Sequence, residues 1–368
     1  MSKKTTTVNL DTPPFGQGFR MPAEWEPHEA TWLTWPQNSS DWPGKLPVIP
    51  WVYGEIIRHL TRHERVCIIV ADEGVEQRAW QVLGKVGVDR QQVEFFRMPT
   101  NRSWIRDSGP LFVVRSHPES QEVAATAWKF NAWAKYEDHN LDEKTPGQVA
   151  ARLKMHCWRP IHGQSRRHVV LEGGAIDVNG AGLMLATEEC LLSKQQHRNP
   201  GMDREDYEKV VHDYLGVKKV IWLKAGIVGD DTHGHVDDVA RFVDRTTVVA
   251  AIEKNRSDAN HEPLEDNLSI LKDARGVYFK RLRVVPIPMP APLYFRGQRL
   301  PASYLNFYIA NNVVLVPTFN DPNDRVALTI LQELFSSRKV IGINCTDLVW
   351  GLGTIHCLTQ QQPAQQPE

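Results

Sequence analysis

Cys357 is the residue of this chain best placed to carry out covalent chemistry. It lies in the run Gly351-Leu-Gly-Thr-Ile-His-Cys357, where the thiol follows a glycine-rich turn and comes directly after His356. A thiol in such a setting can act as a nucleophile once it has lost its proton. The alternative is structural, because free cysteine is among the most buried residue types and commonly packs as a small apolar side chain. Three further runs favour the nucleophile because they add acids and histidines: Trp104-Ile-Arg-Asp107, Leu171-Glu172-Gly-Gly174 and Asp231-Thr-His233-Gly-His235-Val-Asp237-Asp238.

Three acids in these runs, Asp107, Glu172 and Asp237, suit the binding of a planar cation. A guanidinium offers five N–H donors in fixed directions, and two carboxylates can hold it from two sides, for which we select Asp107 and Asp237. The apolar Trp104 close to Asp107 indicates an acid at the mouth of a lined pocket. An apolar run leads into Glu172 and two glycines follow it, as at a strand end that allows close approach. Each acid also has a structural interpretation, since acids near turns cap helices or stay solvated.

The segment from Asp230 to Asp238 is the densest titratable cluster and supports two different mechanisms. In the first, His233, His235 and Asp237 bind zinc or a pair of metal ions that activates water. That mechanism needs more ligands, and no second pair with metal-ligand spacing occurs in the chain. In the second, His235 is the acid and base for the thiol, and His233 is a satisfied surface histidine.

The composition favours chemistry on small molecules. Lys and Arg number 43 against 44 Asp and Glu, and no basic stripe interleaved with aromatic residues is present. The N-terminus is polar with no apolar core after it, and no run approaches a membrane span, so we expect a cytoplasmic protein without a membrane or nucleic-acid partner. The five cysteines include no C-x-x-C pair, which argues against a disulfide framework and a zinc knuckle.

The elements that must position these residues alternate along the chain. Short β-branched runs predict strands near 65–71, 111–115, 168–178, 218–223, 246–252 and 312–317. Amphipathic stretches predict helices near 52–62, 74–86, 203–214, 261–275 and 324–335. The chain is therefore of the α/β class. No Gly-x-Gly-x-x-Gly or Walker loop follows a strand, so we expect no nucleotide cofactor.

The domain organisation follows from the length of 368 residues and the absence of a clear linker. We expect one domain over residues 15–362, with flexible tails at 1–14 and 363–368. The whole Gln/Pro-rich end from Gln360 to Glu368 has the composition of a segment too polar to pack.

Taken together, these motifs resemble those of the agmatine deiminases, the porphyromonas-type branch of the peptidylarginine deiminases and guanidino-group modifying enzymes. The resemblance spans nearly the whole chain. Its motifs are Met21-Pro-Ala-Glu-Trp-Glu-Pro-His28-Glu-Ala-Thr-Trp-Leu-Thr-Trp-Pro36, Asn101-Arg-Ser-Trp-Ile-Arg-Asp-Ser-Gly-Pro110, Phe130-Asn-Ala-Trp133, Leu171-Glu-Gly-Gly174, Thr187-Glu-Glu-Cys-Leu-Leu192, Gly234-His-Val-Asp237, Ser303-Tyr-Leu-Asn-Phe-Tyr308 and Ile355-His-Cys-Leu-Thr-Gln-Gln361.

This resemblance implies a pentein fold, a five-bladed α/β propeller of ββαβ units around a central active-site channel. It also implies a role for each matching residue. Cys357 would be the nucleophile and His235 the acid and base. Asp107 and Asp237 would clamp the guanidinium, and Glu172 would be a further acidic partner.

The implied reaction is the hydrolytic deimination of agmatine to N-carbamoylputrescine and ammonia through a covalent amidino-cysteine, a step in putrescine and polyamine synthesis. Trp104 would line the substrate-binding site. No cofactor or metal would be required. We expect a small guanidine as the partner, and a homo-oligomeric assembly.

Three residues depart from the family pattern and leave the substrate open. Leu352 and Thr354 stand where Gly and Asn are common in that family, and His233 stands where an acid or an amide is common. A side chain at 352 would narrow the approach to the thiol. The alternatives are a deiminase or amidinotransferase for another guanidine such as arginine or peptidyl arginine, the metal-dependent hydrolase described above, and a guanidine-binding protein without activity. We expect core packing for most of the tryptophans near the motifs, which are Trp25, Trp32, Trp35 and Trp133.

Overall fold

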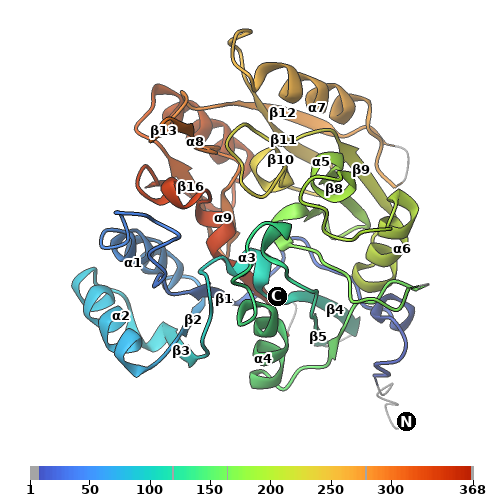
Figure 1. Ribbon diagram of the computed structural model, residues 1–368, viewed down its shortest axis with the longest axis horizontal. Helices are drawn as coiled ribbons and strands as arrows, with labels where there is room; N and C mark the ends of the chain where they lie inside the picture. The colour runs from blue at the N-terminus through green and yellow to red at the C-terminus, as the bar shows by residue number, and fades with distance from the viewer. Residues whose placement is uncertain (1–7, 118–119, 164, 278–279, 366–368) are drawn as a thin grey trace.

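Five sheets, which we call blades 1 to 5, surround the middle of the part of the chain that the structure describes (Figure 1). The structure is a computed structural model, and it describes residues 8–117, 120–163, 165–277 and 280–365. The strands of blades 1 and 2 are β1 His28–Thr34, β2 Arg65–Val70, β3 Val93–Arg97 and β18 Gln360–Pro363, then β4 Leu111–His117, β5 Ser120–Thr126 and β6 Cys157–Trp158. Blade 3 consists of β7 Asp177–Val178, β8 Leu183–Thr187 and β9 Lys219–Leu223. Blade 4 consists of β10 Ala240–Phe242, β11 Thr247–Ile252 and β12 Arg283–Pro288. Blade 5 consists of β15 Tyr308–Ala310, β16 Val313–Thr318 and β17 Lys339–Asn344. A small separate hairpin is formed by β13 Tyr294–Phe295 and β14 Gln298–Arg299.

The blades share one topology. An antiparallel pair of strands is followed by a helix, and the helix leads to a strand parallel to the second member of the pair. A parallel pair needs a crossover connection, and the peripheral helices supply it. These helices are α1 Ile49–Leu60, α2 Glu73–Lys85, α4 Thr145–Arg152, α5 Glu188–Leu192, α6 Arg204–Leu215, α7 His261–Asp273 and α8 Pro322–Leu334. The five-bladed α/β propeller is therefore confirmed.

Short 3₁₀ turns connect these elements, and several of them carry residues of the site. They are η1 Pro14–Gln17, η2 Arg90–Gln92, η3 Ala132–Ala134, η4 Asp142–Lys144, η5 Gly173–Ala175, η6 Val236–Asp238 and η7 Leu348–Gly351.

The ends of the crossover helices are marked by local chemistry. Asp203 caps α6 by accepting from the Asp206 amide while the Asp206 side chain accepts from the Asp203 amide, and Gly216 ends the helix at φ +71°. Asp321 and Asp324 form the same reciprocal cap on α8. Such caps satisfy amides that have no partner within the helix, and a left-handed glycine satisfies the last carbonyls. The helix predictions near 203–214 and 324–335 are confirmed, and these caps explain where the two helices begin.

Blade 1 is completed by the C-terminal end of the chain. β18 pairs antiparallel with β1, with Trp32 opposite Gln360 and His28 opposite Pro363, so the last strand supplies the partner that β1 otherwise lacks. The prediction that the chain from Gln360 onward is too polar to pack is wrong for Gln360–Pro363, which is buried throughout. The polar side chains tolerate burial where they have partners: Trp32 Nε1 donates to Gln362 Oε1 at 2.8 Å, and Arg106 Nη1 donates to Gln361 Oε1 at 2.8 Å. Residues 366–368 lie outside the described residues.

Replacing Gln362 by Ala should lower the free energy of unfolding by roughly 1–3 kcal/mol, because the indole N–H of the fully buried Trp32 loses its acceptor. Urea denaturation followed by circular dichroism measures this change. Gln365→Ala is the control, since that exposed side chain should contribute within about 0.5 kcal/mol of zero. Equal free energies of unfolding for the two variants would contradict a stabilising contact between β18 and Trp32 of β1.

The strand predictions are confirmed in five of six places, and the exception is informative. The run 168–178 was predicted as one strand because it is apolar, yet it contains the turn η5 and only the two-residue strand β7. The glycines after Glu172 break the run and turn the chain towards the centre. An added Cβ at Gly173 would lie 2.3 Å from the Arg106 carbonyl oxygen, so only glycine fits against that backbone.

The N-terminal segment packs in part against the blades. Val8 contacts one of three buried apolar clusters, and Pro14 is buried in η1, so residues 8–14 differ from the flexible tail that was predicted. Residues 1–7 lie outside the described residues. The single domain over 15–362 stays a prediction. No helix among the described residues is both long and apolar enough to cross a bilayer.

Candidate active site

Two short helices near the middle of the blades bring the predicted nucleophile and a predicted acid together. α3 Ile105–Ser108 carries Asp107, and α9 Ile355–Leu358 carries Cys357 (Figure 1). The two side chains line one cavity, and Trp104 lines it with them. Arg106 ties the helices to each other, because its Nε donates to the His356 carbonyl oxygen at 3.2 Å.

Cys357 is nearly buried, with 6% of its surface exposed to the cavity. Its Sγ lies 3.2 Å from Asn306 Nδ2 and 3.7 Å from Asp237 Oδ2. Burial raises the pKa of the Cys357 thiol well above its usual range, and Asp237, Asp238 and Asp107 raise it further. The thiol is therefore protonated at neutral pH, and a cation placed beside it would favour the thiolate.

The backbone around Cys357 leaves room for an approach to Sγ. An added Cβ at Gly353 would lie 2.9 Å from Trp104 Cζ3 and 3.2 Å from Sγ, so glycine is required there. This geometry explains the glycine-rich turn that first pointed to Cys357.

Asp107 presents a carboxylate that is held in place by two donors. Trp133 Nε1 donates to Oδ2 at 2.9 Å, and the Gly174 amide donates to Oδ1 at 3.0 Å. Burial raises the pKa of Asp107 to about 6; Asp237 and Glu172 add to the rise, while His235 opposes it. Asp107 is thus ionised at neutral pH and gains its proton in mildly acidic solution.

Trp133 is a site residue and one of four tryptophans near the motifs, most of which were expected to pack in the core without an individual assignment. It does pack in the core, but it also lines the cavity and donates to Asp107. Ala132, Trp133 and Ala134 have φ angles of +48°, +59° and +53°, a left-handed turn that is uncommon for residues other than glycine. Strain of this kind clusters at functional sites. No sequence pattern signals it, although the run Phe130–Trp133 was among the motifs of the resemblance.

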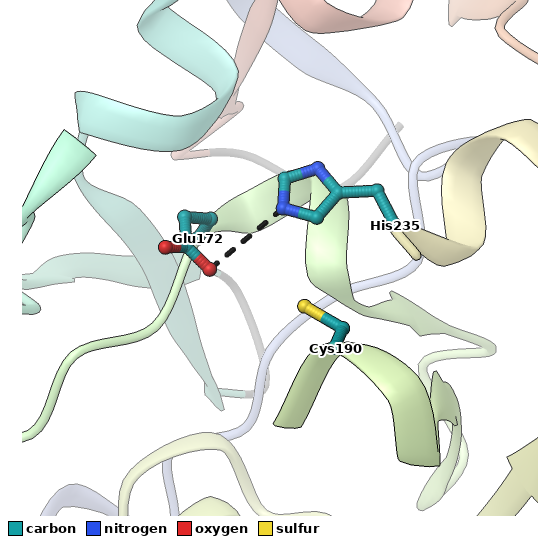
Figure 2. Close-up of side chains that lie close together, drawn as sticks. All are labelled: Glu172, Cys190 and His235. Atoms are coloured by element: carbon teal, nitrogen blue, oxygen red, sulfur yellow. Dashed lines mark ion pairs between the residues drawn. The ribbon is translucent and has the colours of Figure 1, made fainter. Parts of the chain in front are cut away.

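His235 lies between two of the predicted acids, Asp107 and Glu172, and Figure 2 shows its ring facing Glu172. Its Nδ1 is 3.8 Å from Asp107 Oδ1 and its Nε2 is 3.7 Å from Glu172 Oε2, and neither ring nitrogen has a hydrogen-bond partner within the described residues. Burial alone would lower the pKa of His235, but Asp107, Cys190 and Glu172 outweigh it and raise the pKa well above its usual range. The ring is therefore a cation at neutral pH and can donate a proton. An added Cβ at Gly174 would lie 2.5 Å from Nδ1, so glycine makes room for the ring.

Glu172 is fully buried and paired with Arg198, whose Nε lies 3.1 Å from Oε1. Although burial raises the pKa of Glu172, the Arg198 guanidinium outweighs burial and brings it to about 2. Glu172 stays ionised at any ordinary pH. It faces the His235 ring and lies outside the set of residues that line the cavity, which suits an electrostatic effect through His235 better than direct contact with a ligand.

The alternative metal site is not formed by the residues proposed for it. His233 points to Ser193 and Glu189, with Nε2 3.2 Å from the Ser193 Oγ and Nδ1 3.8 Å from Glu189 Oε1. The described residues whose donor atoms could share a metal ion are instead Glu172, Cys190 and His235, which lie within 4.8 Å of one another (Figure 2). The Arg198 cation on Glu172 opposes a metal ion at that place.

Asp237 is linked to the interior by a chain of hydrogen bonds. Its Oδ2 lies 2.7 Å from His356 Nδ1, and His356 Nε2 lies 2.8 Å from Glu24 Oε2. Glu24 in turn pairs with Arg241 at 3.0 Å. Burial would raise the pKa of Asp237, but the His356 hydrogen bond outweighs it and lowers the pKa. Asp237 is therefore a fixed negative charge 3.7 Å from Sγ.

Sequence reasoning missed His356, Glu24 and Asn306 as members of the site. His356 was noted only as a neighbour of the thiol, and the other two lie far from it in sequence. The available signal was their place in the runs Met21–Pro36, Ser303–Tyr308 and Ile355–Gln361, which carried the resemblance.

Comparison with known proteins finds one matching family and similar proteins that cover nearly the whole chain. The model of the family "Porphyromonas-type peptidyl-arginine deiminase" matches residues 20–363. A Legionella pneumophila protein with the provisional name agmatine deiminase is 33% identical over 359 residues, which cover 97% of this chain and 98% of that protein. A Latilactobacillus sakei protein with the same provisional name is 35% identical over 381 residues, at 96% and 99% coverage. The solved structure of Enterococcus faecalis agmatine deiminase is similar at a TM-score of 0.85 and 31% identity, covering 97% of this chain and 98% of that chain.

Proposed function

Because this chain belongs to the Porphyromonas-type peptidyl-arginine deiminase family, we propose that it deiminates agmatine to N-carbamoylputrescine and ammonia. It is an enzyme that acts on C–N bonds of linear amidines. The observation that carries the proposal is the meeting of one thiol with two carboxylates: Asp237 lies 3.7 Å from the Cys357 sulfur, and Asp107 lines the same cavity. Carboxylates around a nucleophile suit a cationic substrate.

The proposed reaction begins with binding of the guanidinium between Asp107 and Asp237. Each carboxylate accepts N–H donors from one side of the planar cation, which holds its carbon near the Cys357 sulfur. The positive charge offsets the acids that keep the thiol protonated, so the thiol releases its proton to solvent. The thiolate then attacks the guanidinium carbon and forms a tetrahedral adduct.

His235 carries the proton transfers that follow. Its imidazolium donates a proton to the departing nitrogen, the C–N bond breaks and ammonia leaves, which gives a cationic amidino-cysteine. The neutral imidazole then takes a proton from a water that attacks the same carbon. The hydroxyl proton of the resulting adduct passes to the departing sulfur as the C–S bond breaks, which releases the ureido product and restores the Cys357 thiol. Glu172 and Asp107 stabilise the imidazolium before the first of these proton transfers and after the second.

Ammonia release and product mass test the proposal, with agmatine and free arginine as parallel substrates and with or without a chelator. Chelator-insensitive conversion of agmatine alone to N-carbamoylputrescine is the expected result. Conversion of arginine in place of agmatine would contradict the proposal that agmatine is the substrate. Loss of activity with the chelator would favour a metal-dependent reaction. A role in putrescine and polyamine synthesis follows from the product.

Leu352 sets the width of the cavity. It lines the cavity with Cys357 and has a φ of +67°, a left-handed conformation that is costly for a leucine. Replacing Leu352 by Gly should raise the KM for agmatine by roughly 3- to 10-fold through lost apolar contact, while bulkier alkylguanidines gain activity. Asn320→Gly is the control, because Asn320 has a φ of +60° away from the cavity. If Leu352→Gly kept the same preference for agmatine over bulkier alkylguanidines, the Leu352 side chain would not contact the substrate.

A cytoplasmic location and a homo-oligomeric assembly stay predictions. Size-exclusion chromatography with light scattering measures the second of these directly.

A further inference from the structure

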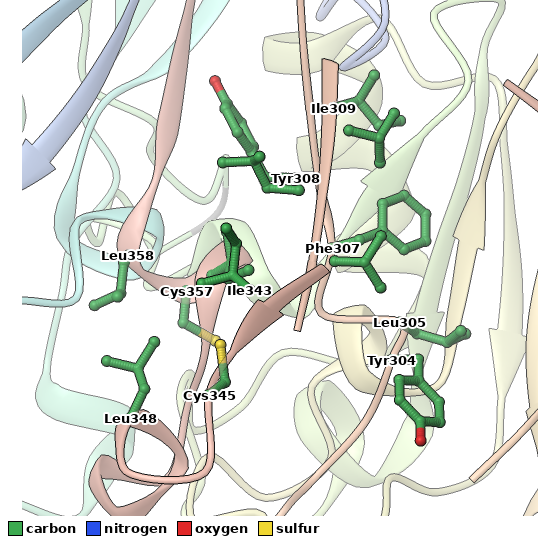
Figure 3. Close-up of a cluster of buried hydrophobic side chains, with 14 of the residues drawn as sticks. Tyr304, Leu305, Phe307, Tyr308, Ile309, Ile343, Cys345, Leu348, Cys357 and Leu358 are labelled. Atoms are coloured by element: carbon green, nitrogen blue, oxygen red, sulfur yellow. The ribbon is translucent and has the colours of Figure 1, made fainter. Parts of the chain in front are cut away.

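Asn306 lies behind the Cys357 sulfur and has a side chain that is fully buried. It comes two residues before β15, in a segment that packs beside α9 in the core (Figure 3). Figure 3 shows Phe307 and Ile309 pointing away from Cys357, whereas Tyr308 points to the side on which Cys357 and Leu358 lie. Side chains alternate along an extended chain, and Asn306 shares the Cys357 side.

The orientation of the Asn306 amide is fixed by two backbone N–H groups, which can donate but cannot accept. Its Oδ1 accepts from the His356 amide at 3.1 Å and from the Cys357 amide at 3.4 Å, and the Thr354 hydroxyl donates to it at 2.8 Å. A flipped amide would point its N–H groups at two backbone N–H groups. The Nδ2 group therefore faces the opposite way, towards Cys357 Sγ at 3.2 Å and Asp238 Oδ1 at 3.1 Å.

An N–H donor at this distance acts differently on the two forms of the sulfur. A hydrogen bond to a charged acceptor is stronger than one to a neutral acceptor, so the bond favours the thiolate. Among the nearby groups that influence the thiol pKa, three carboxylates, Asp107, Asp237 and Asp238, oppose the thiolate, and the Asn306 hydrogen bond lowers the pKa. A neutral amide has a further advantage over a lysine or arginine, since it leaves the acids free for a cationic substrate.

We propose that Asn306 is a catalytic residue, whose Nδ2–H group stabilises the Cys357 thiolate and aims Sγ at the guanidinium carbon, an inference that rests on the proposed deimination. The amide bonds both to the reacting atom and to the backbone that carries it. The Thr354 hydroxyl donates to the Asn306 side-chain oxygen. Thr354, which stands where Asn is common in the family, therefore helps to orient the Asn306 amide.

The test needs two variants. Asn306→Asp keeps the acceptor oxygen for the His356 and Cys357 amides, but it replaces the N–H donor that faces Sγ by an oxygen and adds a negative charge beside Asp238. Asn306→Ala removes both the donor and the acceptor without adding a charge and is therefore the decisive variant. Asn267→Ala is the matched control, since Asn267 is also a buried amide with two backbone hydrogen bonds but lies on α7, outside the cavity.

Two measurements separate a catalytic from a structural role. The first is the rate of Cys357 alkylation by iodoacetamide against pH in the enzyme without substrate, with the labelled residue identified by mass spectrometry. The titratable groups around the sulfur are Asp107 on α3, Asp237 and Asp238 on η6 with His235 before them, and His356 on α9. The second is kcat and KM for agmatine.

In both Asn306 variants the alkylation profile should move to higher pH, with a rate at neutral pH about 10- to 100-fold below that of the unaltered enzyme, the range for a hydrogen bond to a charged atom. The kcat should fall by a similar factor while KM changes less than about 3-fold. Asn267→Ala should keep the wild-type alkylation profile.

An unchanged alkylation profile in Asn306→Ala would overturn the proposal, as would a loss of kcat in that variant no larger than that of Asn267→Ala. The alkylation measurement uses no agmatine. A shifted profile together with an enzyme inactive on agmatine would therefore support the role of Asn306 while rejecting the substrate.

Discussion

Replacing Cys357 by Ser should reduce ammonia release from agmatine by roughly 10⁴- to 10⁶-fold, because the reaction loses its nucleophile. A serine hydroxyl has a much higher pKa than a thiol, and the acids that raise the pKa of Cys357 would oppose an alkoxide still more strongly. The substrate-protected, one-to-one alkylation of the enzyme should disappear in the same variant. Ammonia release and intact-protein mass after alkylation measure both effects.

Cys67→Ser is the control for this prediction. Cys67 is a buried thiol on β2 that lies outside the cavity. Burial raises its pKa to about 12, so it should not react at neutral pH. This variant should keep its activity and its alkylation at Cys357. Full activity of Cys357→Ser would reject covalent catalysis by Cys357. It would favour direct attack of a water molecule that is activated by His235.

The fold was predictable where local chemistry and long-range packing agree. The crossover helices α6 and α8 carry reciprocal caps and an apolar face, and their positions follow from the residues alone. The strand β18 was missed because its glutamines are polar and its stability depends on partners far away in the chain, such as Trp32 and Arg106. Single-chain composition does not reveal that a polar segment will close a blade.

The site was predictable where residue type alone indicates chemistry. Cys357, Asp107 and Trp104 line one cavity, with Asp237 3.7 Å from the Cys357 sulfur and His235 3.8 Å from Asp107, and their roles in the reaction stay predictions. The residues that position them were not predictable, because a tryptophan or an asparagine has many structural uses. Trp133 became a partner of Asp107 through a left-handed turn that no sequence pattern announces.

Replacing Asp107 by Asn should lower kcat/KM for agmatine by roughly 100- to 1,000-fold, with KM raised and kcat reduced together. Removing one charge from a buried, hydrogen-bonded pair costs about 2–5 kcal/mol. The amide keeps the shape of the side chain, and one of its atoms can still accept from the Gly174 amide. The other must then present N–H donors to the Trp133 indole and to the cation, which both need an acceptor.

The pH dependence ties this loss to the Asp107 carboxylate. Since the pKa of Asp107 is about 6, the unaltered enzyme should lose affinity for agmatine as the pH falls through 6 and the carboxylate gains a proton. Asp107→Asn has no such group, so the two enzymes should differ most above pH 6 and approach each other below it. Asp142→Asn is the control, because that acid is buried outside the cavity, and burial raises its pKa to about 7. A constant ratio between Asp107→Asn and the unaltered enzyme from pH 5 to 8 would mean that Asp107 acts through its shape and that another group carries the charge that holds the guanidinium.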